Sequence, residues 1–259
     1  MITYPELGRT GQLGNQYFEI AATISVAVDN GESFGFPRWS CSHYNEDIKC
    51  SPPCHMAYDL LPVKSFLLDK LPDGPSYREP HFHYAPIPYQ PNLRLGGYFQ
   101  SEKYFKRHAG LIRALLTPIS FLIKERAPKT ASIHITMPTG VYTRLPLSYY
   151  EKAIDVMKES GVEKFVVFCF DPVWCARQYS LFDSSPFRIV EAAPLIEHLV
   201  GMMLCEHHII ANSTFSWWAA WLDPNPRKKV ICPGKNWFSP AHTHNKTDDL
   251  FPEEWIRIE

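Results

Sequence analysis

The second half of the chain alternates between short apolar runs and segments with helical spacing. Strands are expected at residues 131–135, 164–170, 187–190, 207–211 and 229–232, and helices between them at residues 147–160, 172–179, 194–206 and 214–222. Each of these helices can carry the chain from the end of one parallel strand to the start of the next. This alternation predicts an α/β fold in which helices cover both faces of a parallel sheet.

The first half is less regular. Strands are expected at residues 2–4, 33–36 and 93–98, and helices at residues 15–29 and 101–117. Residues 37–91 are rich in proline, aromatic residues and cysteine, so we expect functional or interface loops there.

The domain organisation follows from this contrast. A hinge at residues 118–128 separates an N-terminal domain, residues 1–125, from a C-terminal domain, residues 126–259. The tail from residue 248 is expected to cross back and pack Trp255 and Ile256 on the neighbouring domain.

Composition and charge argue against several classes of protein. The 259 residues carry a formal net charge of −1 and no basic stripe, which argues against a nucleic-acid binder. No apolar run approaches the roughly 20 residues of a membrane span, and the first residues lack the pattern of a signal peptide. We therefore expect a soluble, cytoplasmic protein without a membrane span; peripheral membrane association and a trimmed anchor stay open.

A loop in the first half contains several residues that can bind zinc. These residues are Cys41, Cys50, Cys54, His43 and His55. Their spacing matches no usual paired-ligand pattern, so no metal site is predicted.

A polar tip follows the fourth expected strand of the second half. Asn212, Ser213 and Thr214 favour turns and helix N-caps, and the helix after them is strongly aromatic. In a doubly wound sheet such a tip lies at the carboxyl end of a strand, where backbone N–H groups and hydroxyls can receive a phosphate. Ser213, Thr214 and Ser216 are then candidate ligand groups. The alternative is that Asn212 or Ser213 only caps a core helix.

Five stretches of the chain resemble one known family. Residues 212–222 read NSTFSWWAAWL, residues 11–16 read GQLGNQ, residues 97–102 read GYFQSE, residues 145–154 read LPLSYYEKAI and residues 249–256 read DLFPEEWI. These motifs cover nearly the whole chain in the usual order. They resemble the α-1,2-fucosyltransferase-like glycosyltransferases of glycosyltransferase family 11.

The resemblance implies a fold and an activity. The fold is GT-B-like, with two Rossmann-like lobes facing a cleft and a doubly wound sheet in the C-terminal lobe. The activity is an inverting transfer of a sugar, fucose by family default, from a GDP-linked donor to a hydroxyl of a glycan acceptor. The donor is a co-substrate, and no cofactor is implied. No Asp-x-Asp pair occurs in a suitable loop, which favours a metal-independent enzyme.

One family motif is degenerate in this chain. Where the family has His-x-Arg-Arg-x-Asp, only His134 is retained, while Thr136, Met137 and Thr139 replace the two arginines and the aspartate. In the family the first arginine grips the donor diphosphate. Three explanations stay open: Arg144 supplies the missing charge, the donor differs from GDP-fucose, or the protein is a weak or inactive relative that binds a nucleotide or a carbohydrate.

The resemblance also assigns candidate site residues. The donor-binding candidates are His134, Thr136, Asp171, Asn212, Ser213, Thr214, Phe215 and Ser216, and the catalytic candidate is Arg144. Asp171 would accept hydrogen bonds from guanine, or only cap the helix that starts at Pro172. From the N-terminal lobe, Gly14, Asn15 and Gln16 would line the cleft.

The general base for the acceptor hydroxyl is not identified by the sequence, because Thr139 replaces the aspartate of the motif. Glu102 and Asp47 are the two carboxylates that could take this role.

Overall fold

The computed structural model describes residues 1–9, 11–38, 58–191, 193–234 and 237–259. The chain forms two compact units. Unit 1 comprises Met1–Ile119 and Asn245–Pro252, and unit 2 comprises Ser120–His244 and Glu253–Glu259. Within the described residues, no helix combines the length and apolar character that crossing a membrane requires.

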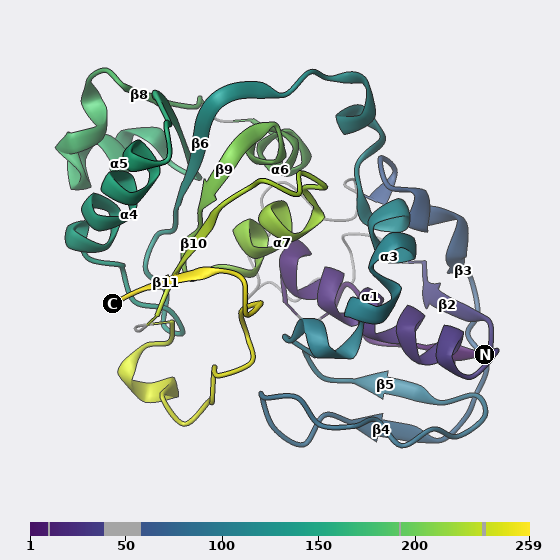
Figure 1. Cartoon of the computed structure of the whole chain (residues 1–259). Helices are drawn as coiled ribbons and strands as arrows, with labels where there is room; N and C mark the ends of the chain where they lie inside the picture. The colour runs from purple at the N-terminus through teal and green to yellow at the C-terminus, as the bar shows by residue number, and fades with distance from the viewer. Residues whose placement is uncertain (10, 39–57, 192, 235–236) are drawn as a thin grey trace. The chain divides into compact units, whose positions relative to one another are not determined.

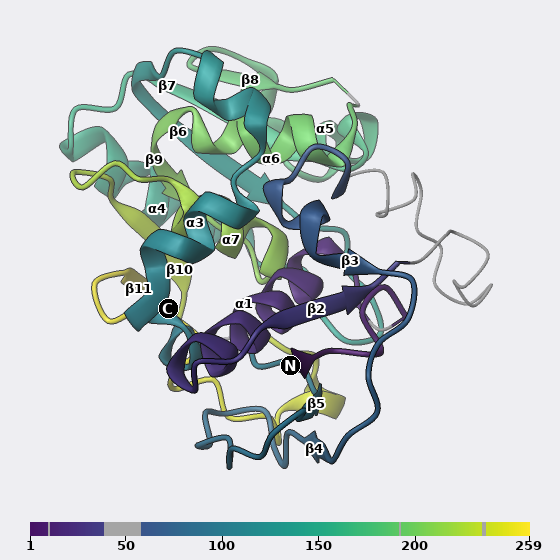
Figure 2. The same cartoon turned by 90° about the vertical axis from the view of Figure 1, so that its right-hand side faces the viewer.

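Unit 1 contains a parallel sheet with the strand order β3-β2-β1-β5-β4 (Figures 1 and 2). Its strands are β1 (Ile2–Thr3), β2 (Phe34–Pro37), β3 (Leu67–Leu68), β4 (Ser76–Arg78) and β5 (Arg94–Gly96). Helix α1 (Leu13–Asp29) packs against β1 and β2 and is buried along most of its length. Asn30 follows α1, and Gly31 then takes a positive φ of 64°, a conformation that glycine adopts without strain.

The helix expected at residues 101–117 is wrong in its first half. Ser101 accepts a hydrogen bond from the Lys103 backbone N–H but opens only a 3₁₀ turn, Glu102–Tyr104. A second 3₁₀ turn, Lys106–His108, precedes the α-helix α3 (Ala109–Leu116). The break falls at Phe105, which has φ −143° and is fully buried with its ring 5.9 Å from Phe18. Tertiary packing of this ring thus overrides the local helical pattern.

Unit 2 contains a six-stranded parallel sheet with the order β11-β10-β9-β6-β7-β8. Its strands are β6 (Ala127–Ile135), β7 (Lys164–Cys169), β8 (Phe187–Ile189), β9 (Cys205–Ile209), β10 (Val230–Pro233) and β11 (Ile256–Ile258). Its helices are α4 (Leu147–Glu159), α5 (Pro172–Gln178), α6 (Leu195–Met203) and α7 (Thr214–Leu222). Figure 1 shows α4 and α5 on one face of this sheet and α6 and α7 on the other. The predicted α/β class with parallel sheets is confirmed.

The direction of chain progression reverses at the centre of this sheet. From β6 the chain first builds β7 and β8 on one side, and it then returns to place β9, β10 and β11 on the other side. Such a reversal is the switch point at which doubly wound sheets bind ligands, beyond the carboxyl ends of the strands. In unit 2 this point lies between β6 and β9.

The C-terminal tail divides between the two units. Residues Asn245–Pro252 belong to unit 1, whereas Glu253–Glu259 return to unit 2, where β11 pairs with β10. Trp255 packs its ring 5.4 Å from Trp217 of α7. The expected crossing of the tail is thus found for residues 248–252, whereas Trp255 and Ile256 remain in unit 2, where β11 pairs with β10.

Candidate functional site

Asn212 ties together three segments at the carboxyl ends of β6 and β9. Its side-chain oxygen accepts a hydrogen bond from the Thr136 hydroxyl at 3.1 Å. Its amide nitrogen donates to the carbonyls of Thr143 at 2.8 Å and Trp237 at 3.0 Å. Asn212 is 1% exposed, so these bonds are shielded from water. The predicted residues Thr136 and Asn212 are thus brought together at the switch point.

Ser213 begins helix α7 and keeps part of its surface accessible. Its side-chain oxygen accepts a hydrogen bond from the Phe215 backbone N–H at 3.3 Å, which confirms the capping alternative. Ser216 instead accepts from the Ala211 N–H and donates to the Ser213 carbonyl, both at 3.3 Å, and is buried. Thr214 is also buried. Ser213 is therefore the most accessible hydroxyl of the three.

His134 presents a buried nitrogen at the same place. Its Nδ1 has no hydrogen-bond partner among the described residues, and its ring centroid lies 5.9 Å from that of Phe215. Burial, with a smaller effect of His198, lowers the pKa of His134 to about 3, so the ring is neutral near pH 7. A buried polar atom without a partner costs free energy that a ligand hydrogen bond would recover.

The degenerate motif continues into a tight turn. The Thr139 hydroxyl oxygen accepts hydrogen bonds from the N–H groups of Val141 and Tyr142. Ser239 holds this turn from outside, because its N–H donates to the Val141 carbonyl at 2.7 Å and its hydroxyl donates to the Gly140 carbonyl at 2.9 Å. Thr139, which replaces the aspartate of the family motif, therefore has a local structural role.

The Arg144 side chain contacts the end of helix α5. Its guanidinium donates to the side-chain oxygen of Gln178 and lies 6.0 Å from the ring centroid of Tyr179. The Tyr179 hydroxyl in turn donates to the Leu145 carbonyl at 2.8 Å. Contact with a donor phosphate would require Arg144 to leave Gln178, which is an exposed contact and hence a weak one.

Asp171 follows β7 at the same edge of the sheet. Its carboxylate accepts a hydrogen bond from the Trp174 N–H at 2.9 Å, and Pro172 takes the first helical position. The predicted N-cap role is confirmed. Asp171 is half-buried, so a second hydrogen-bond acceptor position stays accessible.

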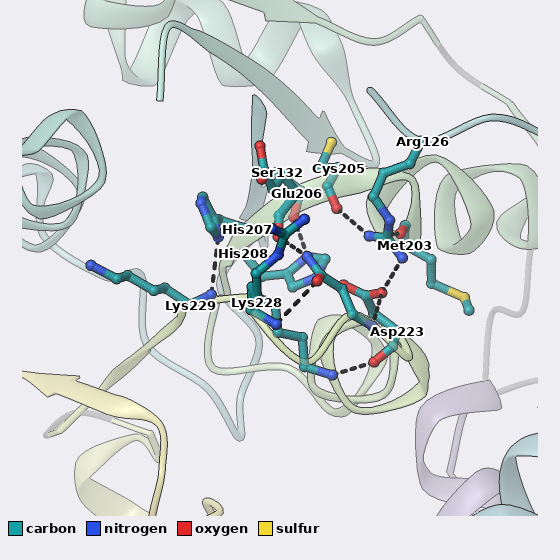
Figure 3. Close-up of polar contacts among 12 residues, drawn as sticks. Arg126, Ser132, Met203, Cys205, Glu206, His207, His208, Asp223, Lys228 and Lys229 are labelled. Atoms are coloured by element: carbon teal, nitrogen blue, oxygen red, sulfur yellow. Dashed lines mark hydrogen bonds and ion pairs between the residues drawn. The ribbon is translucent and has the colours of Figure 1, made fainter. Parts of the chain in front are cut away.

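A buried polar network lies at the C-terminal end of helix α7, around Asp223 (Figure 3). Asp223, the first residue after α7, accepts from His208 Nε2 at 2.9 Å and from the Arg126 guanidinium at 2.5 Å. His208 Nδ1 lies 2.9 Å from the Ser132 hydroxyl. Burial opposes the ionisation of Asp223, but the hydrogen bonds from His208 and Arg126 outweigh it and lower the pKa of this carboxyl. Burial lowers the pKa of His208, so His208 is neutral beside an ionised Asp223.

This network resembles a serine hydrolase triad in its order of contacts only. A nucleophilic serine must be reachable by substrate, whereas Ser132 is 2% exposed and lies in the middle of β6. A structural role fits better. Arg126 also donates to the carbonyls of Met203 and Cys205, so the network connects α6, α7, β6 and β9. Sequence reasoning missed it because its members are far apart in the chain.

Tyr149 is a second residue that the sequence did not single out. It lies in α4, within the family-like stretch of residues 145–154, and is 3% exposed. Its hydroxyl donates to the Ile210 carbonyl at 2.6 Å and is 3.3 Å from the Ile231 carbonyl. Tyr149 thereby fixes the chain just before Asn212.

In unit 1, two of the predicted cleft residues hold neighbouring segments in place. Asn15 accepts a hydrogen bond from the Gln100 amide at 3.0 Å. Gln16 accepts from the Tyr58 hydroxyl at 2.8 Å and donates to the Gly11 carbonyl at 3.1 Å. Gly14 is buried in the first turn of α1. A role of these three residues toward a ligand stays a prediction.

Of the two candidate general bases, Glu102 and Asp47, the structure describes only Glu102. Asp47 and the possible zinc ligands Cys41, His43, Cys50, Cys54 and His55 lie outside the described residues. Glu102 is paired with Lys106 at 2.6 Å and its side chain is 9% exposed, which makes it poorly available as a base. Within the described ranges, no group of three or more His, Cys, Asp and Glu side chains could hold a metal ion.

Glu79 is a carboxylate of unit 1 that sequence reasoning overlooked. One of its oxygens accepts from the N–H groups of Tyr98 at 2.8 Å and Phe99 at 3.0 Å, and the other accepts from the Tyr104 hydroxyl at 3.3 Å. Burial raises the pKa of Glu79 to about 7. A Cβ on Gly97 would lie 2.3 Å from the Glu79 Cβ, so only glycine fits there. Glu79 thus shapes the family-like stretch of residues 97–102.

The sequence of this chain is similar to those of known glycosyltransferases. Residues 139–259 match the model of glycosyl transferase family 11. The chain is 32% identical over 181 residues to an alpha-1,2-colitosyltransferase of Escherichia coli, which covers 63% of this chain and 61% of that protein. It is 33% identical over 118 residues to the O-antigen biosynthesis glycosyltransferase WbnK of Escherichia coli, which covers 44% of this chain and 37% of that protein.

The chain therefore spans less than two thirds of the length of either relative. The matched family region begins at Thr139, the last position of the degenerate motif, and contains the Asn212–Leu222 segment. The resemblance carried by the sequence motifs is confirmed for residues 139–259, which are similar to glycosyl transferase family 11.

Proposed function

We propose that the chain is an inverting, metal-independent glycosyltransferase that moves a sugar from a nucleotide-sugar donor to a hydroxyl of a glycan acceptor. The donor is GDP-linked, and fucose is the sugar that the family implies. The observation that carries the proposal is the meeting of β6 and β9 at the reversal of strand order, where helix α7 begins with an accessible Ser213.

The donor diphosphate binds at the start of α7 in this proposal. The positive end of the helix dipole and the Ser213 hydroxyl favour an anion there. His134 Nδ1, which has no partner among the described residues, donates to the ribose or phosphate when the neutral ring carries its single proton on Nδ1. Asp171 accepts from the N1–H and exocyclic amine of guanine.

In this proposal Arg144 stabilises the negative charge that develops on the leaving phosphate. The side chain turns away from Gln178 on donor binding, since a diphosphate is a stronger partner for a guanidinium than a neutral amide. In unit 1, Gly14, Asn15 and Gln16 serve the acceptor glycan or the donor phosphates.

The relatives support a range of donor sugars rather than one. The name of the alpha-1,2-colitosyltransferase states colitose for that protein, so nucleotide-linked colitose belongs beside GDP-fucose in any assay of this chain. Thr136 and Met137 stand where the family has arginines, which supports a pocket that differs from that of a fucosyltransferase.

A second candidate function is a nucleotide- or carbohydrate-binding protein without turnover. The loss of both motif arginines and the engagement of Arg144 by Gln178 favour it. Calorimetry with GDP, UDP and dTDP, followed by a donor-hydrolysis assay, separates the two. Tight binding of GDP with hydrolysis of a GDP-sugar supports the transferase; binding without hydrolysis or transfer for any donor supports the binding protein.

The Ser213→Gly variant tests the position of the diphosphate. Glycine retains most of the N-cap stability but lacks the hydroxyl, so the fold is kept while one ligand hydrogen bond is lost. GDP affinity measured by calorimetry is expected to fall by about 1 to 3 kcal/mol. Ser160→Ala, which removes a hydroxyl at the end of α4, is the matched control and should leave affinity unchanged. Equal affinity of wild type and Ser213→Gly would show that the diphosphate binds elsewhere.

A further inference from the structure

Unit 1 contains a cavity of about 300 Å³, a volume at the lower end of the range for small-molecule sites. It is formed by the loop that follows β1 together with strands β4 and β5. The residues that line it are Pro5, Glu6, Arg9, Ser76, Tyr77, Arg78, Arg94, Leu95 and Gly96.

The register of β4 and β5 explains why its floor is polar. Ser76 is paired with Arg94, and Arg78 with Gly96, so these four residues project from the same face of the sheet. Leu95 between them points to the opposite face and is 2% exposed. A Cβ on Gly96 would lie 3.8 Å from the Arg78 Cζ, which places the guanidinium over the glycine.

The lining carries an excess of positive charge. Arg9, Arg78 and Arg94 are opposed by a single lining carboxylate, Glu6. Glu6 lies 3.5 Å from Arg78, which is long for an ion pair, and both side chains are largely exposed. No side-chain partner of Arg9 is found in the described part of the chain. A surplus of guanidinium groups in a hollow attracts anions, although the whole chain is near neutral.

Arg94 provides the most specific observation. Its Nε is buried and has no hydrogen-bond partner in the described structure. Its terminal nitrogen reaches only Asp73, at 3.5 Å, and that carboxylate is fully exposed. A buried guanidinium N–H that lacks an acceptor is destabilising, and a bound oxyanion would supply one.

We propose that this cavity binds an oxyanion-bearing sugar, either a uronic acid or a sugar phosphate. The guanidinium groups of Arg9, Arg78 and Arg94 hold the oxyanion, while the Ser76 hydroxyl contacts the ring. The oxyanion part follows from the arginines alone; the sugar part rests on the proposed glycosyltransferase function and assigns an acidic residue to its acceptor glycan.

Calorimetry or ligand-observed NMR with four probes tests the site: glucuronate, glucose 6-phosphate, glucose and inorganic phosphate. At least one acidic sugar is expected to bind roughly tenfold more tightly than glucose or inorganic phosphate, with an affinity that falls as salt is added. The two acidic probes decide between a carboxylate and a phosphate.

Variants connect this binding to the cavity. Arg9→Ala and Arg78→Ala are each expected to weaken it roughly tenfold, and Glu6→Gln to tighten it, because a competing carboxylate is removed. Arg38→Ala is the matched control, since Arg38 pairs with Asp69 on the surface of the same unit and outside the cavity. Circular dichroism checks the fold of each variant.

Unchanged affinity in both arginine variants, equal binding of glucose, or no saturable binding of either acidic sugar overturns the proposal. Inorganic phosphate that binds as tightly as the acidic sugars overturns its sugar part. GDP binding by the wild-type protein is measured in parallel. If the protein binds glucuronate but not GDP, the proposed function is rejected and the proposed oxyanion site is retained.

Discussion

Two buried carboxyl groups of this protein show how the chemistry of the hydrogen-bond donors decides protonation. Asp223 meets a guanidinium and a histidine, so its pKa is lowered despite burial. Glu79 meets two backbone N–H groups and a tyrosine hydroxyl, all neutral, and burial raises its pKa to about 7. Two backbone N–H groups and a hydroxyl therefore do not compensate for the loss of hydration at Glu79, whereas the hydrogen bonds of His208 and Arg126 do so at Asp223.

The pKa of Glu79 makes the stability of the protein depend on pH. A folded-state pKa above the unfolded value of 4.5 means that the native state holds the proton more tightly, so this contribution to stability is complete below about pH 4.5 and is lost as pH rises through about 7. At 1.36 kcal/mol per pKa unit the effect is at most about 3 kcal/mol. Glu79→Gln should remove it, as measured by denaturant unfolding between pH 4.5 and 8.

The quantity to compare is the difference between the wild type and Glu79→Gln at each pH. His134 has a lowered pKa, and its contribution to stability changes in the opposite direction below pH 6.5 in both proteins. A difference that stays constant over this range would contradict the assigned protonation of Glu79.

At the scale of elements, helix α7 is fixed at both ends. At its start, Ser213 caps the helix and Asn212 anchors the preceding turn to three segments. At its end, Asp223 joins it to β6 and β9 through Arg126 and His208. The network in Figure 3 therefore does not contact the proposed diphosphate itself. It positions helix α7, whose first turn faces the diphosphate.

Removal of the Asp223 carboxylate should uncouple this helix. Asp223→Ala leaves Arg126 and His208 without their partner in a buried place, so the free energy of unfolding is expected to fall by about 3 to 5 kcal/mol. Glu163→Ala also removes a carboxylate from an ion pair in unit 2, with Lys129, but there both side chains are about 60% exposed. This control should change stability by less than about 1 kcal/mol. Similar losses in chemical denaturation for the two variants would show that the buried network is not an anchor.

The sequence predicted β6 to β10 and the four helices of unit 2, most of which are long enough to show periodicity; it missed β11, which has three residues. Strands β3 and β4 of unit 1, with two and three residues, give no such signal. Asn212 and Ser213 were found because turn and capping residues stand together in the chain. Asp223 and Arg126 were not, since 97 residues separate this pair and only the folded sheet brings it together.

At the scale of the whole molecule, neither unit is built from one continuous segment. The chain passes between the units three times: after Ile119, after His244 and after Pro252. Residues Asn245–Pro252 anchor in unit 1 partly through Asp249, whose carboxylate accepts from the Tyr84 N–H at 2.7 Å and whose carbonyl accepts from the Ser101 hydroxyl at 2.8 Å.

The last seven residues should be essential for unit 2. A chain that ends at Pro252 lacks β11 and the Trp255 ring, which is 6% exposed. Loss of a buried tryptophan alone destabilises a protein by about 3 to 5 kcal/mol. Thermal unfolding followed by tryptophan fluorescence should show a large fall in midpoint temperature, whereas a chain ending at Ile258 should match the full chain. An unchanged midpoint for the shorter chain would mean that β11 contributes nothing to the sheet.

The divided tail has a consequence for how the protein is made in the cell. A ribosome releases the N-terminal segments first, and domains usually fold as they emerge. Here the segments that complete both units belong to residues 245–259. Both units therefore remain incomplete until residues 245–259 have left the exit tunnel, and the edge of β10 that pairs with β11 stays unpaired until then.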